Sequence, residues 1–368
     1  MQTELQREGE HMMSVCNACR YCEALCAVWP AMEFRRAFNE HDLNYLANLC
    51  HNCSECYYAC QYAPPHEWKI NSPLTFAKIR NASWEQYAWP KPLAKAFRYN
   101  GLITALLTAV VLALFIFGIV NARGSAGWAV AVPGGDFYAI TSHDLLTVTF
   151  SAVALFVLLS LGVGLVRFWR DVEEKMIDLI NPPALLRTIK EVLRLEYLDE
   201  RGWGCTYPGE TNSQSRRWFH HITFYGFLLC FAATTTGFIY HYGFHWYAPY
   251  GYTSLPVILG TLGGLGLLVG PVGLWVLKSQ RNPDISDERG WDIDVAFLVT
   301  LLLTSATGLL LLVLRETSGM SLLLAFHLGL VMALFLMLPY GKFVHAVYRS
   351  AAILKYALER ARKETIGV

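Results

Sequence analysis

The stretch CNACRYCEALC, residues 16–26, decides how the first part of this chain must fold. Its cysteines follow the spacing C-x2-C-x2-C-x3-C, and CHNCSECYYAC, residues 50–60, repeats that spacing with each cysteine 34 positions later (Cys50 against Cys16). Four thiolates at this spacing are typical ligands of a cubane four-iron cluster. The duplication therefore predicts two 4Fe-4S clusters, and with them an electron relay, close to the N-terminus.

The order of the cysteines also predicts which of them share a cluster. In two-cluster proteins the fourth cysteine of each run binds the cluster of the other run. This exchange gives two ligand sets: Cys16, Cys19, Cys22 and Cys60 for the first cluster, and Cys50, Cys53, Cys56 and Cys26 for the second. Zinc is the alternative, but structural zinc sites usually use two separated C-x2-C pairs. The proline that usually follows the fourth cysteine is replaced by Ala27 and Gln61.

The remainder of the chain is predominantly apolar. Of its 368 residues 54% are hydrophobic and 16% charged, whereas soluble domains contain about a quarter charged residues. A membrane-spanning helix needs about 20 apolar residues, and six segments meet that requirement: 99–122, 145–166, two within 218–277 that are divided by HYGFHWYAPYGYTS at 241–254, 295–314 and 317–341. The net charge of +1 gives no reason to expect a nucleic-acid partner.

These features predict an all-α protein in three parts. Residues 1–98 would form an α-helical ferredoxin-like domain, because the sequence between the cysteine runs has helical periodicity without strand alternation. Residues 99–350 would form a six-helix transmembrane bundle that carries haem b, with a cytoplasmic insertion at 167–218. Residues 351–368 would be a cytoplasmic tail.

Basic residues flank the predicted spans mainly on one side of the membrane. They are Lys91, Lys95, Arg98, Arg167, Arg170, Arg216, Arg217, Lys278, Arg281, Lys342, Arg349, Lys355 and Arg360. The opposite connections carry only Arg123 and Arg315. Because basic loops stay inside, we expect the cysteine-rich domain and both termini in the cytoplasm.

Histidines at the ends of the spans are a second set of candidate ligands. His327 and His345 are 18 residues apart, which is about five whole turns and about 27 Å of one continuous helix. The sixth span would thus offer one ring near each membrane surface. The third span runs antiparallel to it, so His220 would face His345 and His241 would face His327. Two histidines on facing helices can hold a b-type haem, so the sequence predicts an inner haem and a possible outer one.

Several polar or small residues allow more than one interpretation. His221 is an alternative to His220 as a ligand, while His143 and His245 are better explained as interfacial rings. Cys205 is either a packed loop cysteine or part of a turn that covers a cluster. The glycines of the fourth span, at positions 260, 263, 264, 266, 270 and 273, favour close helix packing over a flat cofactor.

Four segments carry a resemblance to known families. The second cysteine run with its continuation to NSPLTFAKIR looks like the helical ferredoxin modules of respiratory oxidoreductases. The stretch FHLGLVMALFLMLPYGKFVH, 326–345, resembles the haem-bearing helix of the respiratory nitrate reductase gamma subunit. With RRWFHHITFYGF and GCTYPGE, the whole chain is similar to the tricarballylate-utilisation protein B family, also called the citrate-utilisation B type.

The resemblance implies a multi-pass protein of the bacterial inner (cytoplasmic) membrane with a partner flavoprotein dehydrogenase. The partner would oxidise tricarballylate or a related tricarboxylate, and this chain would pass the electrons through two 4Fe-4S clusters and haem b to the quinone pool. No dehydrogenase active site is evident in the chain itself. The alternatives are a membrane-bound iron–sulfur redox sensor and a transporter with an accessory cluster domain. A transporter is disfavoured because the spans lack Asp, Glu, Lys and Arg.

Overall fold

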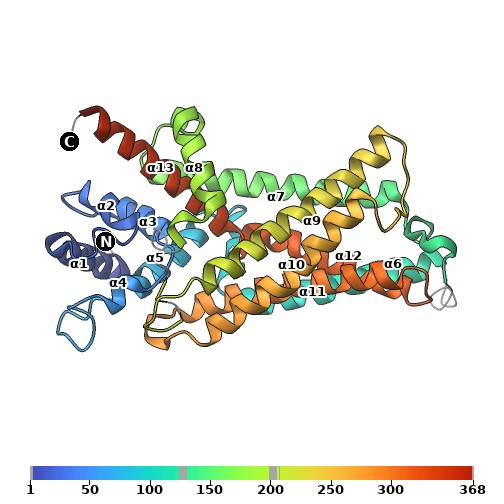
Figure 1. Ribbon diagram of the computed structural model, residues 1–368, viewed down its shortest axis with the longest axis horizontal. Helices are drawn as coiled ribbons and strands as arrows, with labels where there is room; N and C mark the ends of the chain where they lie inside the picture. Colours follow the sequence, from blue (N-terminus) through green and yellow to red (C-terminus); the bar gives the residue numbers. More distant parts are fainter. Residues whose placement is uncertain (1–2, 124–130, 199–204, 207, 367–368) are drawn as a thin grey trace.

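The structure, a computed structural model, describes residues 3–123, 131–198, 205–206 and 208–366, and in these ranges it is built of helices without strands. The cysteine-rich part folds as five helices at one end of the molecule, at the left of Figure 1. They are α1 (Glu4–Cys19), α2 (Val28–Glu33), α3 (Glu40–Leu49), α4 (Glu55–Tyr58) and α5 (Ser72–Tyr87). The all-α prediction with a helical ferredoxin-like domain is therefore confirmed.

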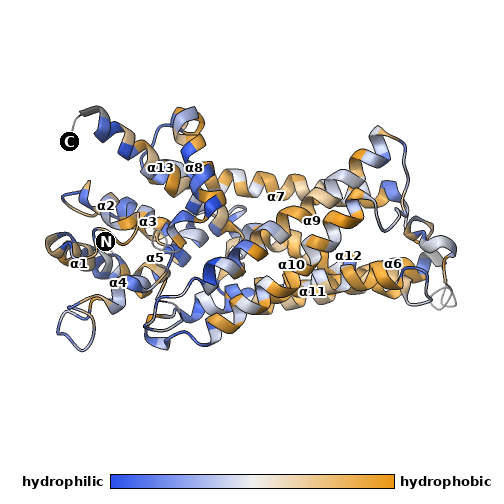
Figure 2. Cartoon of the chain, in the orientation of Figure 1, coloured by the Kyte–Doolittle hydropathy of each residue, from blue (hydrophilic) through white to orange (hydrophobic). Residues whose placement is uncertain are grey.

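Six long apolar segments form the second part, and each is long enough to cross a membrane. The helices are α6 (Asn100–Arg123), α7 (His143–Asp171), α9 (Ser215–Gly243), α10 (Leu255–Ser279), α11 (Glu288–Leu314) and α12 (Met320–Met337). They run alongside one another and are composed mainly of apolar residues along their length (Figure 2), many of which are exposed, such as Leu114, Leu155 and Leu262. The aromatic stretch 244–254 separates α9 from α10, as the sequence predicts.

The sixth span is not the single continuous helix that the histidine spacing assumed. Helix α12 ends at Met337, a 3₁₀ turn, η9 (Leu338–Tyr340), contains Pro339, and Gly341 is extended before α13 (Val344–Ile366) begins. Proline lacks the amide hydrogen that an uninterrupted helix needs and its ring clashes with the preceding turn. The prediction that His327 and His345 project from one helix in line is therefore wrong.

Glycines bring α9 and α10 into close contact. A Cβ on Gly263 would lie 2.8 Å from the backbone nitrogen of Cys230, and one on Gly226 would lie 3.0 Å from the carbonyl oxygen of Gly263. Small residues allow two membrane helices to approach this closely. Helix α9 thus occupies the glycine-rich face of α10, which confirms the packing interpretation.

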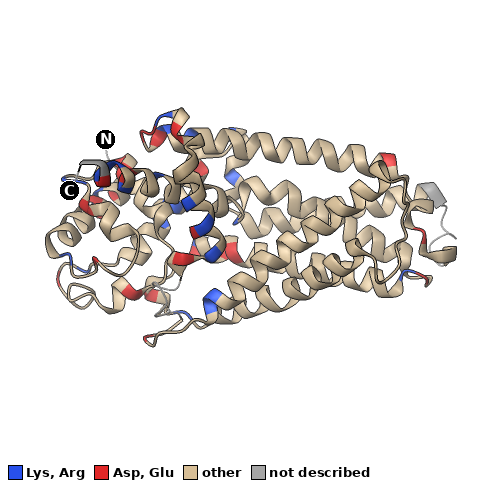
Figure 3. Ribbon diagram, turned by 45° about the horizontal axis from the view of Figure 1, so that its top comes forward, with Lys and Arg blue, Asp and Glu red and all other residues tan. Residues whose placement is uncertain are grey.

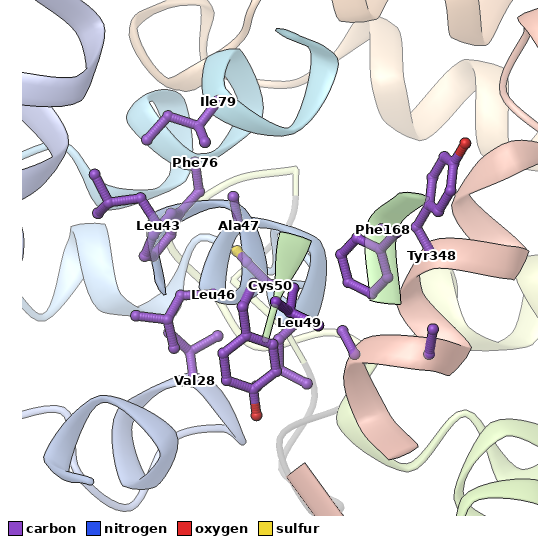
Figure 4. Packing of buried hydrophobic residues seen from close by; sticks show 14 of the residues in the cluster. Val28, Leu43, Leu46, Ala47, Leu49, Cys50, Phe76, Ile79, Phe168 and Tyr348 are labelled. Carbon is purple, nitrogen blue, oxygen red and sulfur yellow. The ribbon is translucent and has the colours of Figure 1, made fainter. Parts of the chain in front are cut away.

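The C-terminal segment is part of the core of the cysteine domain. Helix α13 packs on α3, and Ala352, Leu354 and Leu358 are each at most 4% exposed. Figure 4 shows this core, in which residues of α3 and α5 lie close to Phe168 of α7 and Tyr348 of α13. What the sequence suggested was a tail is a helix that joins the membrane bundle to the cysteine domain.

Polar contacts reinforce the same junction. Arg35 donates to Asp42 at 2.5 Å and to Glu359 at 2.6 Å, and the buried Tyr45 hydroxyl donates to Glu359 at 2.9 Å. Charged residues gather at this end of the molecule and are sparse along the long helices (Figure 3). The cysteine domain and the adjacent ends of the spans therefore form one continuous folded unit.

Candidate functional site

A first pocket contains the four cysteines of the first predicted ligand set. Cys16, Cys19, Cys22 and Cys60 all line it, together with Cys56. The Tyr62 amide donates to the Cys60 sulfur at 3.4 Å, and the Gln61 side-chain amide donates to the Cys19 sulfur at 3.7 Å. Such N–H···S bonds stabilise thiolate ligands and tune a bound cluster. Gln61, which replaces the usual proline, thus contributes a donor that proline could not.

A second pocket contains the other ligand set. Cys26, Cys50, Cys53 and Cys56 line it, and Trp29 lies between it and the first pocket because it lines both. The loop 50–54 curls around this pocket with Asn52 and Ser54 in the left-handed region, at φ values of 56° and 74°. The Asn52 amide donates to the Cys50 sulfur at 3.3 Å. The grouping of cysteines is the one that exchange of the fourth cysteine requires.

Burial disfavours the charged form of these thiols when no cation is present. It raises the pKa of Cys16 and that of Cys22 to about 12, and it also raises the pKa of Cys56. Among the described residues, no three His, Cys, Asp or Glu side chains converge tightly enough for a single metal ion. Four cysteines around each pocket are a donor set that suits an iron–sulfur group.

Cys205 lies against the second pocket. It is 1% exposed, contacts Cys53, and its thiol donates to the Leu198 carbonyl oxygen. Hydrogen bonding with Cys205, followed by burial, raises the pKa of Cys53. Cys205 and Ser213 also pair through their backbones. Cys205 is thus packed beside the second pocket, while residues 201–204 and 207 of the same turn lie outside the described residues.

Two arginines connect the second cysteine loop with the histidines of the bundle. Arg349 of α13 donates to the Cys50 carbonyl oxygen at 2.9 Å, and Arg216 of α9 donates to the carbonyl oxygens of His51 and Asn52 at 2.8 and 3.0 Å. Each arginine lies one helical turn from a candidate ligand, His345 or His220. The second pocket and the histidine pair are therefore neighbours across the domain junction.

His220 and His345 face each other at this junction. Their ring centroids are 6.1 Å apart and their planes are almost perpendicular, at 86°. An imidazole nitrogen binds a metal at about 2 Å, so two rings on opposite sides of one iron have centroids about 6 Å apart. His345 Nδ1 bonds to the Lys342 carbonyl oxygen at 2.5 Å, whereas His220 Nδ1 is buried with no hydrogen-bond partner among the described residues. His220 and His345 are therefore the two histidines that would hold a haem at this junction.

The ring of the adjacent residue, His221, has a different neighbour. His221 stacks on Tyr225 of its own helix, with the centroids 5.7 Å apart. Of the two candidates on α9, His220 is therefore the one that the structure places opposite His345.

The structure arranges the outer histidines differently from the predicted pair. His241 stacks on His143, with centroids 3.5 Å apart and planes at 2°. His327 instead lies against α11, 3.2 Å from both Thr307 Oγ1 and the Thr304 carbonyl oxygen. His241 lies about 3 Å along the axis from the end of α9, whereas His327 lies about two turns, or about 10 Å, from the start of α12. The antiparallel alignment thus places these two rings at different depths.

Several residues of the site lie outside the sequence prediction. Arg80, which donates to the Cys50 carbonyl oxygen, is one of them and belongs to neither the cysteine nor the histidine pattern. The sequence presents Gln61 only as a replacement for proline, and Arg216, Arg281 and Arg349 only as basic flanks, so it does not predict their hydrogen bonds at the site. His245, at the start of the loop after α9, has a left-handed backbone with φ of 55°.

Comparison with known proteins agrees with this architecture. The family description "Citrate utilization protein B" matches residues 97–365, and its "Fer4-like domain" matches residues 9–88. A citrate utilization protein B from Escherichia coli is 47% identical over 368 residues, which covers 100% of this chain and 96% of that protein. No solved structure matches the chain. On these grounds the chain belongs to the citrate utilization protein B family.

Proposed function

We propose that this chain is a membrane electron-transfer protein that reoxidises a partner flavoprotein dehydrogenase and delivers the electrons to the quinone pool. The two cysteine sets would hold two 4Fe-4S clusters, and His220 and His345 would hold one haem b. These groups supply one-electron redox chemistry when bound, which allows a two-electron donor to be oxidised in single steps. The observation that carries the proposal is the succession of two adjacent four-cysteine pockets, the second of which neighbours a facing histidine pair.

The chain's own residues would position and insulate this pathway. The first pocket is at the exposed end of the cysteine domain, where Tyr21 is 73% exposed, and it is the expected docking face for the dehydrogenase. The second pocket is buried beside α9 and α13. Helices α9 and α13 then fix the two histidines at the edge of the membrane bundle, from which quinone can be reached.

The proposal extends to location and substrate. The basic residues at the cysteine-domain end support a cytoplasmic position for both termini, in a bacterial inner membrane. The name of the Escherichia coli relative refers to citrate utilization, so a tricarboxylate such as tricarballylate or citrate is the expected class of substrate for the dehydrogenase. The proposal is limited to one haem because His241 and His327 lie at different depths.

Reoxidation by quinone tests this function. The purified full-length chain would be reduced anaerobically with dithionite, the excess reductant removed, and a soluble ubiquinone or menaquinone analogue added. Rapid oxidation of both iron–sulfur and haem absorbance is expected, and a double variant, His220→Ala with His345→Ala, should oxidise far more slowly. A redox sensor would not need quinone, so a reduced chain that quinone leaves unchanged would contradict electron delivery.

A further inference from the structure

Four arginines surround the loop that forms the second pocket, and we call Arg80, Arg216, Arg281 and Arg349 the arginine collar. Arg80 donates to the carbonyl oxygens of Ala47 and Cys50 at 3.1 and 2.9 Å. Arg281 donates to Asn52 Oδ1 at 3.0 Å and to the Ser54 hydroxyl at 3.3 Å. Arg216 and Arg349 bind the carbonyl oxygens of residues 50–52 as described above. These four residues come from α5, α9, α13 and the segment after α10, and these contacts are all made to uncharged oxygens.

Two members of the collar, Arg80 and Arg349, carry positive charge that no carboxylate of the described residues pairs with. Arg80 is 5% exposed, and neither Arg80 nor Arg349 forms an ion pair among the described residues. The Nε atoms of both are buried without a hydrogen-bond partner. Asp294 is a carboxylate near Arg349, but Lys278 at 2.7 Å and Lys342 at 2.6 Å already bind it. Buried charge without a counterion is costly, so the pocket is suited to an anionic group such as an iron–sulfur centre with four thiolates.

The first pocket has no comparable excess of positive charge. Its lining includes one arginine and one glutamate, Arg20 and Glu23, and the Arg20 guanidinium bonds to Asn17 at the exposed surface. The carboxylate of Glu55 lies near Cys22. The two pockets therefore differ in electrostatic environment even though their cysteine spacing is identical.

We propose that the arginine collar raises the reduction potential of the second centre above that of the first and so directs electrons inward. Net charge around a cluster is one of the terms that set its potential, and nearby positive charge stabilises the reduced, more negative form. One electron leaves the group bound by the Cys16 set and arrives at the group bound by the Cys50 set, with no bond or proton exchanged. This inference rests on the proposed function, because it requires both clusters.

Redox titration of the full-length protein followed by electron paramagnetic resonance tests the collar. Two cluster signals with separate midpoint potentials are expected in the wild type. In Arg80→Gln and Arg349→Gln the higher potential should move down while the lower one stays in place. Arg349→Lys, which keeps the charge, should leave both in place, and Arg20→Gln should move only the lower one. Iron and acid-labile sulfide would be measured for every variant to show whether both clusters are present. If the Arg80→Gln protein does not fold, the Arg349→Gln protein provides the test.

The outcomes separate this inference from the proposed function. Equal potentials of the two clusters in the wild type would contradict the role of the collar. So would an Arg349→Gln protein that contains both clusters and shows no downward shift. Neither result would contradict the proposed electron transfer. Complete absence of cluster signals from the wild type would overturn the proposed function itself.

A separate observation concerns helix α8 (Pro182–Arg194), whose apolar residues point away from the protein. Leu186, Ile189 and Leu193 share one face and are 70%, 51% and 40% exposed, whereas Glu191 is buried and pairs with Arg360 of α13. The preceding turn η5 (Met176–Ile180) also exposes Ile177 and Ile180. A helix on a water-facing surface places its polar residues outward. The exposed apolar face of α8 must therefore be covered by another apolar phase.

The geometry points to the membrane interface as that phase. The segment is attached to the ends of two spans, since η5 follows α7 closely and the Tyr225 hydroxyl of α9 donates to the Leu193 carbonyl oxygen at 2.8 Å. Helix α8 crosses the direction of the long helices (Figure 1). Arg187, Lys190 and Arg194 add exposed positive charge beside the apolar face, which complements the anionic headgroups of an inner leaflet.

Photocrosslinking in lipid nanodiscs that contain phosphatidylglycerol tests this placement. The full chain would carry benzoylphenylalanine at position 189, with Leu158, a 68% exposed residue of α7, as the lipid-facing control and Tyr21 as the exposed control of the cysteine domain. Lipid adducts are expected at 189 and 158 and not at 21. Lipid adducts at position 158 but not at 189 would overturn the inference. A polypeptide adduct at position 189 after addition of the dehydrogenase would also overturn it, because the apolar face of α8 would then be a protein-docking surface.

Discussion

At the scale of single residues, the pairing of His220 with His345 is the feature through which the membrane bundle would take part in redox chemistry under the proposed function. The rings come from α9 and α13, and their centroid separation of 6.1 Å leaves room for one metal ion between them. His221 is next in sequence to His220 but faces Tyr225. Adjacent histidines therefore have different expected roles, which makes them a matched pair for mutation.

Haem content should follow that difference. Replacement of His220 or His345 by Ala should reduce haem per protein from about one to near zero, because bis-histidine ligation needs both rings. His221→Ala should retain haem. The pyridine haemochrome assay measures the content, with acid-labile sulfide as a check that the cysteine domain remains intact. Loss of haem in His221→Ala with retention in His220→Ala would reverse the assignment.

Glu359 is a second residue with a measurable role, because it accepts from both Arg35 and Tyr45 inside the domain junction. Glu359→Ala leaves the buried Tyr45 hydroxyl unpaired and deprives Arg35, whose side chain is 10% exposed, of one of its two carboxylates. Loss of charged hydrogen bonds of this kind costs about 2–3 kcal/mol, which lowers the melting temperature by several degrees. Scanning calorimetry would measure it. Glu364→Ala, at a side chain that is 71% exposed, should change the melting temperature little, and an equal effect of the two would contradict the role of the junction.

At the scale of elements, the sequence was informative wherever a local rule determines structure. Asn71 caps α5 by accepting from the Leu74 amide at 3.2 Å, and Pro73 lies in the first turn, as expected for a helix start. The spans were predictable because hydrocarbon thickness fixes their length. The break between α12 and α13 lies outside the sequence prediction, because the spacing of His327 and His345 suits one continuous helix and a proline such as Pro339 also occurs in helices that only bend.

The close contact of α9 and α10 gives a prediction for helix packing. Gly263→Ala would place its Cβ 2.8 Å from the backbone of both Cys230 and Gly226, which forces the helices apart and should cost about 1–3 kcal/mol. Gly162→Ala in α7 is the control, because a Cβ there has no atom within 4 Å. Thermal denaturation in detergent, followed by loss of haem absorbance, compares the two. Equal stability of the variants would contradict the packing.

At the scale of the whole molecule, the C-terminal helix makes the two parts interdependent. Helix α13 contributes His345 at one end and buried residues of the cysteine domain further on. The sequence alone gave no indication of this, because the contacts between Tyr45 and Glu359 or between Cys50 and Arg349 join positions roughly 300 residues apart. Cysteine spacing could predict the ligand sets because cluster geometry constrains local loops, whereas the surrounding arginines follow only from the folded chain.

Truncation tests that interdependence. A chain that ends after residue 350 keeps every predicted ligand but removes the buried residues 351–358. We expect it to lose most of its iron and acid-labile sulfide, because the core under α3 would be exposed to water. A chain that ends after residue 364 is the control and should retain both. Full cluster content in the shorter chain would show that the cysteine domain folds without α13.

The most direct measurement is the stoichiometry of iron, acid-labile sulfide and haem in the full-length protein purified anaerobically. Two four-iron clusters and one haem predict about nine iron atoms and about eight sulfides per chain, with the absorption bands of reduced b-type haem. A colourless protein that contains zinc and no inorganic sulfide would contradict the electron-transfer assignment.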